Sequence, residues 1–306
     1  PQDETPVNKL DEARLEQFIR RYIAAQPVGA REINFVWQGG EPLLAGLSFY
    51  KKALALQARY APDGVTISNS LQTNGTLIND AWCRLFREHG FIIGLSLEGN
   101  EALQDYHRPD KRGRSTWSAA LRGIDLLHQH QVDFNLLVVV HNEMAAHAAA
   151  IYDRLVSLGA RYLQFQPLMS EGDALAQGYR LSADNWGRFM VAIWRQWRKR
   201  DDIGRVFVMN IEQAWGQYFS HTSATCVHAA RCGSNLVMEP DGRGLTGAEA
   251  MLGGARQGED EGGLALRGAE RYGVEEYCRL FGDVDAIVAI FSLGALVRLI
   301  APHLKS

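Results

Sequence analysis

The sequence predicts an α/β fold, a whole or partial (β/α) barrel, from three observations. Short apolar, β-rich runs alternate with longer segments whose apolar residues recur at helical spacing. The connections between them are short, which is typical of parallel strands joined by helical crossovers. Polar, glycine-containing turns follow several of the strands. In barrels of this kind the loops after the strands carry the function.

Each element follows from its own pattern. Residues 10–25 place apolar side chains on one face of a helix, and the β-rich run 32–37 after them ends at the sharp break Gln38-Gly39-Gly40-Glu41-Pro42. The same two patterns then recur in alternation. Strands are expected at 65–71, 91–97, 134–140, 162–166 and 206–209. Helices are expected at 47–60, 78–89, 117–129, 145–158 and 182–199.

The alternation stops near residue 210, which divides the chain into a barrel over 1–210 and a second region over 211–306. Residues 241–273 are rich in glycine and poor in β-branched and aromatic side chains. That composition favours a loop or poorly ordered chain. Residues 284–304 return to an apolar helical pattern.

Composition excludes several classes of protein. The 306 residues carry a formal net charge of −3 and the pI is near 6.3, so nucleic acid is not an expected partner. The longest apolar run, 286–297, is too short to span a bilayer. The first residues lack a basic start followed by an apolar stretch, so no secretory signal is expected. We therefore expect a cytoplasmic protein without a membrane partner.

The four cysteines are Cys83, Cys226, Cys232 and Cys278. A disulfide scaffold does not suit a chain of this size and cysteine density. Buried thiols, a redox pair and metal or cluster ligands remain as alternatives. Cys226 and Cys232 are close enough to share one metal or cluster, and His228 between them makes zinc a competitor. Cys83 lies at an apolar-facing helical position, which favours a buried free thiol.

The turn after the first strand is the strongest local signal. Gly39 and Gly40 let a backbone approach a ligand, and Glu41 adds negative charge suited to a ligand ammonium group. A plain turn is the alternative. Similar turns follow the next two strands, in Gln72-Thr73-Asn74-Gly75 and at the end of Gly94-Leu95-Ser96-Leu97-Glu98-Gly99.

Several strings in this order resemble one known family. They are WQGGEPLLAGLSFY, ISNSLQTNGTLINDAWC, IIGLSLEG, YHRPD, FNLLVVV and YLQFQPL. They resemble the radical S-adenosylmethionine (SAM) superfamily, and within it the anaerobic sulfatase-maturating enzymes of the SPASM subgroup. The similarity runs from about residue 10 to residue 242. It implies a partial barrel of radical SAM type followed by an incomplete SPASM-like region for auxiliary clusters.

The resemblance implies roles for individual residues. Gly40 matches a position whose backbone meets the SAM amino group, Ser96 one that contacts the ribose, and Arg108 one that pairs with the SAM carboxylate. Met169 matches a backbone contact on the adenine side, and Gln38 a glutamine near the substrate peptide. Without the resemblance, Arg108 would be interpreted as a solvated arginine and Ser96 as a helix cap.

The resemblance also implies iron-sulfur clusters. Cys226 and Cys232 match the first ligands of an auxiliary 4Fe-4S cluster, and Cys278 loosely matches the last. The family's CxxxCxxC motif, which holds its catalytic 4Fe-4S cluster, does not occur in the sequence. Neither does the aspartate that serves as catalytic base. Either the sequence is the ordered part of a longer chain with one catalytic and two auxiliary clusters, which we favour, or the clusters have been lost.

The function implied is that of an anaerobic sulfatase-maturating enzyme. A SAM-derived radical abstracts hydrogen from a Cys or Ser of a sulfatase polypeptide, which becomes formylglycine, and flavodoxin or ferredoxin supplies electrons. One alternative is another SPASM peptide maturase that forms thioethers or crosslinks. The other is a cluster-free barrel acting as a binding protein.

Overall fold

The computed structural model describes residues 10–168, 181–218, 236–238 and 244–246. Its contacts divide the chain into two compact units. One comprises Phe18–Ile211, and the other comprises Pro1–Gln17 with Glu212–Ser306. The domain boundary expected at residue 210 stays a prediction.

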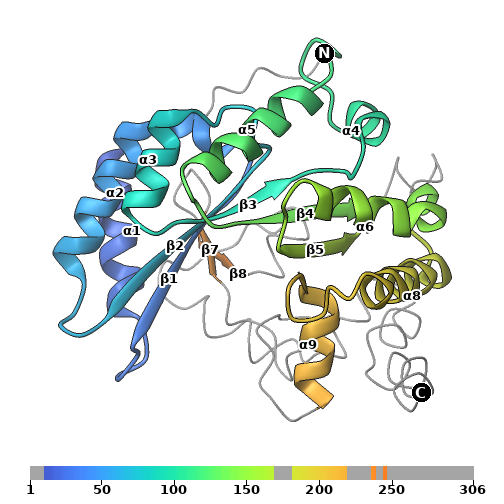
Figure 1. The fold of residues 1–306 in the computed structure, drawn as a ribbon. Coiled ribbons are helices and arrows are strands. Elements are labelled where there is room, and N and C mark those ends of the chain that lie inside the picture. The colour runs from blue at the N-terminus through green and yellow to red at the C-terminus, as the bar shows by residue number, and fades with distance from the viewer. Residues whose placement is uncertain (1–9, 169–180, 219–235, 239–243, 247–306) are drawn as a thin grey trace. The chain divides into compact units, whose positions relative to one another are not determined.

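A six-stranded parallel sheet forms the centre of the unit Phe18–Ile211. Its strands are hydrogen-bonded in the order in which they follow along the chain, as in one part of a (β/α) barrel (Figure 1). This confirms the predicted α/β partial barrel. The strands are β1 (Glu32–Trp37), β2 (Thr66–Thr73), β3 (Ile92–Ser96), β4 (Phe134–Val140), β5 (Tyr162–Pro167) and β6 (Phe207–Val208).

Helices connect the strands. The α-helices are α1 (Glu12–Ala24), α2 (Leu47–Tyr60), α3 (Asp80–Glu88), α4 (Glu101–His107), α5 (Trp117–Gln129), α6 (Ala148–Ser157), α8 (Ala183–Lys199) and α9 (Met209–Tyr218). The sequence prediction missed α4, α9 and the 3-10 turn η1 (Pro42–Ala45). Neither α4 nor η1 is long enough to show periodicity, and the strand expected to reach Met209 ends at Val208, where α9 follows. The helix expected over 145–158 is divided into the 3-10 turn η2 (Asn142–His147) and α6.

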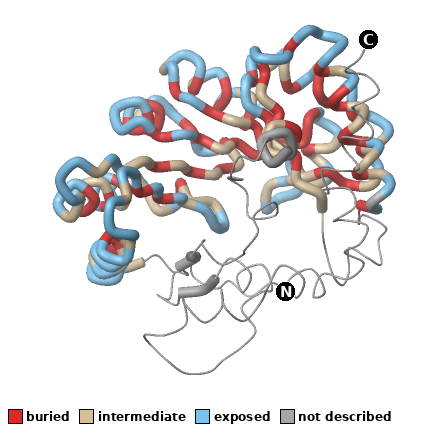
Figure 2. The backbone as a smooth tube through the Cα atoms, turned by 90° about the horizontal axis from the view of Figure 1, so that it is seen from below, coloured by how far each residue is buried: buried red, intermediate tan, exposed pale blue. Residues whose placement is uncertain are grey.

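The core of this unit lies between the sheet and its helices. Successive strand residues point to opposite faces, and in β1 the alternate residues Ile33 and Phe35 are buried while Asn34 and Val36 are exposed. Phe35 packs edge-on against Tyr22 of α1, and Phe165 of β5 packs against Phe189 of α8. Figure 2 shows buried residues along the strands and on one side of the helices.

The opposite face of the sheet carries many polar side chains, beside the apolar Val36, Ile92 and Leu137. By the same alternation, several half-exposed amide and hydroxyl side chains point away from the helices. They are Ser70, Gln72, Asn135, Gln164 and Gln166. A face of this kind suits a polar ligand, which places the possible site on the inner face and carboxyl edge of the sheet.

A buried polar network fixes the first two strands. The side chains of Gln57 in α2 and Asn69 in β2 exchange two hydrogen bonds of 2.9 Å. The Trp37 indole donates a third bond, of 2.8 Å, to Asn69 Oδ1. Since each of these buried groups has a partner, the network holds the end of β1, where the Gly-Gly turn begins, in one position.

The strand β6 is short because a side chain takes over part of the pairing with β5. The amide of Asn210 accepts a hydrogen bond of 2.9 Å from the Phe165 main-chain N–H and donates one of 2.8 Å to the Phe165 carbonyl. These are the groups that a longer strand would have paired.

In the second unit, β7 (Leu236–Met238) and β8 (Gly244–Thr246) pair antiparallel. The prediction of loop across 241–273 was therefore wrong at Gly244–Thr246. The helical pattern at 284–304 lies outside the described residues. Within the described part of the chain, the search for a long apolar helix that could cross a membrane finds none.

Candidate active site at the carboxyl edge of the sheet

Glu41 joins the turns that follow β1 and β2. Its Oε1 accepts hydrogen bonds from the Thr73 hydroxyl (2.8 Å) and the Leu43 main-chain N–H (3.1 Å). Its Oε2 accepts one of 2.9 Å from the Asn74 main-chain N–H. Glu41 thus ties two loops together, and the expectation that its charge also serves a ligand ammonium group stays a prediction.

The Gly-Gly turn is open to a ligand. Gly39 and Gly40 have φ values of 111° and 54°, which disfavour residues with a side chain. A Cβ built at either position would meet nothing within 4 Å. Gln38, Gly39 and Gly40 are exposed. The glycines are therefore required by backbone conformation, and the space beside them is accessible.

The end of β3 carries a buried ion pair. Arg108, which follows α4, donates from Nε to Oε1 of Glu98. The Glu98 side chain is 1% exposed and that of Arg108 is 28% exposed. Burial raises the pKa of Glu98, against the lowering effect of Arg108. Arg108 is thus not simply solvated, and its charge is held at the carboxyl edge between β3 and β4.

Ser96 is the last residue of β3 and is buried. It does not cap the next helix, because Asn100 does so by accepting a hydrogen bond from Leu103 N. Through strand pairing Ser96 lies opposite Leu137 of β4. Its expected contact with ribose stays a prediction.

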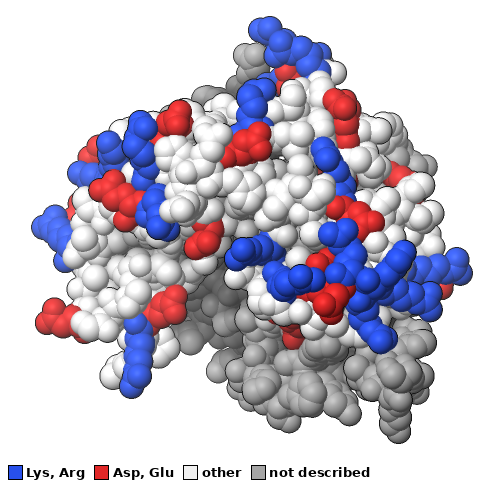
Figure 3. Space-filling model, in the orientation of Figure 1, with Lys and Arg blue, Asp and Glu red and all other residues white. Residues whose placement is uncertain are grey.

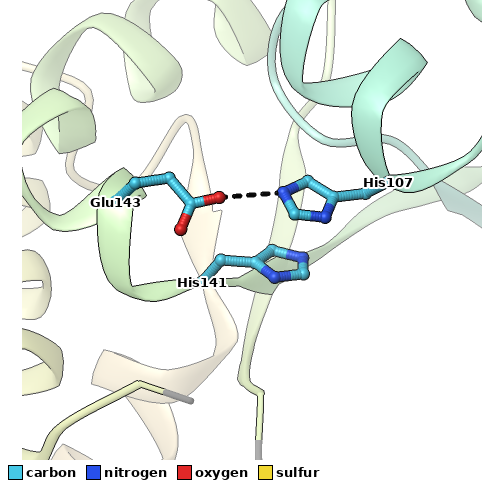
Figure 4. Close-up of side chains that lie close together, drawn as sticks. All are labelled: His107, His141 and Glu143. Atoms are coloured by element: carbon cyan, nitrogen blue, oxygen red, sulfur yellow. Dashed lines mark hydrogen bonds and ion pairs between the residues drawn. The ribbon is translucent and has the colours of Figure 1, made fainter. Parts of the chain in front are cut away.

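Beside this ion pair lies a cluster formed by His107, His141 and Glu143 (Figure 4). His107 ends α4, His141 follows β4, and His107 Nε2 lies 3.0 Å from Glu143 Oε1. Burial, with the nearby His107, lowers the pKa of His141 to about 4, so this imidazole is neutral at pH 7. His141 Nδ1 is buried without a hydrogen-bond partner among the described residues.

The potential ligand atoms of these three residues lie within 4.8 Å of one another. However, the two imidazole rings are stacked, with centroids 3.5 Å apart and planes 13° from parallel. A histidine nitrogen binds a metal along a lone pair in its ring plane, and here the lone pairs lie in nearly parallel planes. This arrangement does not suit one shared ion unless a ring turns.

The remaining predicted site residues fall elsewhere. Met169, Cys226, Cys232 and Cys278 lie outside the described residues. Cys83 is a free, fully buried thiol on α3, as expected. Burial raises its pKa to about 11, so it is a thiol at neutral pH, whereas a cluster ligand is a thiolate.

Sequence reasoning missed Glu98, His107 and His141 as individual site residues. Each lies in a segment next to a strand end or next to Arg108, which was the available signal. Their importance depends on burial and on contacts between segments far apart along the chain. Neither can be derived from one polar residue in a turn.

A parallel sheet with helical crossovers, a polar inner face and charged groups at the strand ends defines a class: the complete or partial (β/α) barrels, which bind ligands at this edge. The family model described as the Radical SAM superfamily matches residues 3–155, half of the 306 residues. The chain belongs to this superfamily.

Among curated relatives, a serine-type anaerobic sulfatase-maturating enzyme of Klebsiella aerogenes is 93% identical over 243 residues. The match covers 79% of this chain and 60% of that protein. A serine-type enzyme of Bacteroides thetaiotaomicron is 34% identical over 255 residues, covering 78% of this chain and 61% of that protein. The chain thus spans about three fifths of the length of these relatives.

A similar solved structure is described as native anSMEcpe with bound AdoMet and Kp18Cys peptide. It superposes with a TM-score of 0.69 at 30% sequence identity, covering 76% of this chain and 64% of that chain. The partial barrel therefore has a counterpart in a structure described with bound AdoMet and a peptide.

Proposed function

We propose that the protein acts as a serine-type anaerobic sulfatase-maturating enzyme, which oxidises a serine of a sulfatase polypeptide to formylglycine. One observation carries the proposal: 93% identity over 243 residues to a relative of that name. The serine target is favoured because the first three relatives, at 93%, 92% and 34% identity, are all serine-type. The cysteine-type enzyme of Clostridium perfringens is 32% identical.

The described residues fit SAM. The exposed main chain at Gly40, with open space beside it, suits the approach of the amino group. The guanidinium of Arg108 is partly exposed and suits the carboxylate. Ser96 ends β3, and the family resemblance proposes it as the contact to the ribose. Gln38 is exposed at the rim, where a peptide would meet it.

The described residues do not fit the catalytic 4Fe-4S cluster, since Cys83 is their one cysteine and is buried as a thiol. We therefore derive no step through that cluster. Cys226, Cys232 and Cys278 remain proposed auxiliary ligands.

Conversion of serine to formylglycine removes one hydrogen atom from Cβ, one proton from the hydroxyl and one further electron, so it balances when the SAM-derived radical takes the hydrogen atom, a base the proton and an electron acceptor the electron. The part of this chain is to hold SAM at the strand ends through Gly40, Ser96 and Arg108, and to orient the peptide against it.

The test uses the full-length enzyme, reconstituted with iron and sulfide under anaerobic, reducing conditions. A sulfatase-derived peptide with serine at the target position is incubated with it and SAM, and the product is weighed by mass spectrometry. Loss of two hydrogen atoms from the peptide is expected. SAM cleavage without this mass change would contradict the proposal and favour a maturase with another peptide product.

An electron donor is part of the proposal. Figure 3 shows Lys and Arg gathered over α8 and the chain beside it, including the exposed Arg195, Arg198 and Lys199. A local positive surface favours association with an acidic protein such as flavodoxin. SAM cleavage driven by flavodoxin should slow with added salt and with Arg198→Glu, while cleavage driven by dithionite should be insensitive to that substitution. Equal effects on both would contradict this surface.

A further inference from the structure

Four residues around the β3 end form a closed cycle of hydrogen bonds. The Glu98 main-chain N–H donates to Gln104 Oε1 over 3.0 Å, and Gln104 Nε2 donates to Thr116 Oγ1 over 3.1 Å. The Thr116 hydroxyl donates to the Arg108 carbonyl over 2.7 Å. Arg108 Nε closes the cycle on the carboxylate of Glu98. The end of β3, helix α4 and the residue before α5 are thereby joined.

The Glu98 and Gln104 side of the cycle is protected from solvent, whereas Arg108 and Thr116 are partly exposed. Glu98 and Gln104 are each 1% exposed. The next residue, Gly99, has φ 88°, and a Cβ there would come within 2.8 Å of Ile151 in α6. The backbone after Glu98 therefore lies against α6, and this leaves the carboxylate little freedom to move.

Burying the Glu98 carboxylate costs stability, which a purely structural role does not explain. Burial raises its pKa, and its Oε2 has no hydrogen-bond partner among the described residues. A buried ion pair often contributes little or nothing to stability compared with neutral side chains. Its effect on Arg108 is specific: with Nε bound to Glu98, the two Nη groups remain for a second carboxylate, in the fork geometry that arginine uses for such ligands.

We propose that Glu98 is a positioning residue, which aims the Nη groups of Arg108 at the carboxylate of SAM through this hydrogen-bond cycle. The inference rests on the proposed function, in which Arg108 pairs with that carboxylate. It adds a residue that touches no ligand atom but sets the direction of one that does.

The test measures dissociation constants of the reconstituted full-length enzyme for SAM and for decarboxylated SAM. Arg108→Ala should weaken SAM binding by about 30-fold, as expected for loss of a charged pair, and decarboxylated SAM by about twofold or less. Glu98→Gln, which keeps the size of the side chain, should weaken SAM binding by about tenfold, as for other residues that orient a ligand-binding group. In the Arg108→Ala background it should change SAM binding by about twofold or less.

Glu101→Gln is the matched control, because it removes the same charge from an exposed position three residues away. It should leave both affinities unchanged.

If Arg108→Ala weakens the binding of SAM and of decarboxylated SAM equally, the proposed role of Arg108 fails, and the positioning role of Glu98 fails with it. If Arg108→Ala weakens SAM binding more than decarboxylated SAM binding but Glu98→Gln does not, only the positioning role is overturned. The same holds if the losses of SAM affinity in the two single variants add in the double variant. A Glu98→Gln effect equal on both ligands would mark a structural role and also overturn it.

Discussion

The carboxyl edge of the sheet contains two glutamates held in opposite ways. Glu41, between β1 and β2, accepts three hydrogen bonds from the loops around it. Glu98, at the end of β3, is buried against Arg108, with His107 and the Val139 main chain also acting on it, and its Oε2 has no hydrogen-bond partner among the described residues. A carboxylate with several donors ties segments together, whereas Glu98 lies against one partly exposed arginine, whose charge the proposed function assigns to a ligand carboxylate.

Glu41→Ala should have the largest effect on stability. It leaves Thr73 and two main-chain N–H groups without their acceptor, so the free energy of unfolding should fall by about 2–3 kcal/mol. Urea unfolding of the full-length protein measures it. Glu32→Ala is the control, because that exposed carboxylate accepts one hydrogen bond, from Ser68. Equal losses in the two variants would show that the number of bonds at Glu41 is unimportant.

The second predicted effect is a change of stability with pH, and it concerns His141, which follows β4. The pKa of His141 falls from 6.5 to about 4 in the folded protein. Between these values the unfolded chain binds a proton that the folded chain does not, so stability is complete above pH 6.5 and decreases as the pH falls toward 4. His141→Gln should remove roughly 1–3 kcal/mol of this pH-dependent loss.

Unfolding free energies at pH 7 and pH 4.5 check this prediction for His141. His89→Gln, at an exposed histidine, should keep the slope of the wild-type protein. If His141→Gln left the dependence of the unfolding free energy on pH unchanged, the buried His141 ring would bind a proton as readily as a histidine in water.

Gly40→Ala should have a smaller effect. At φ 54° an alanine is strained, which costs about 1 kcal/mol, although the space beside it is open. Gly187→Ala, in the helix α8 with equally open space, should instead stabilise by about 0.5–1 kcal/mol. Differential scanning calorimetry of the two variants separates strain from packing. A stabilising Gly40→Ala would contradict the required left-handed backbone.

Much of this fold was predictable from the sequence, because it depends on local periodicity. The strands at Glu32–Trp37 and Phe134–Val140 and the helices at Leu47–Tyr60 and Trp117–Gln129 have the predicted bounds. The short helix α4 was not predictable, since seven residues contain too little of a helical repeat.

Only the location of the site could be predicted from the sequence. The rule that function follows the strands located Gly40 and Ser96 at one edge. What each side chain does depends on partners far along the chain. Glu41 is bound by Thr73 and Asn74, and no local pattern distinguishes that tie from a free charge.

Glu98→Gln should change stability least and ligand binding most clearly, and it tests the contrast between the two glutamates most directly. The melting temperature of full-length, reconstituted enzyme is measured with and without SAM for the wild type and for Glu98→Gln. Without SAM the variant should melt within about 1 °C of the wild type, because a neutral amide removes a buried charge and Arg108, left without its partner, is partly exposed to water. With saturating SAM for the wild type, the rise in melting temperature should be clearly smaller for the variant, because its affinity is lower. A large drop without SAM and an unchanged rise with it would contradict the account, because Glu98 would then stabilise the fold as Glu41 does.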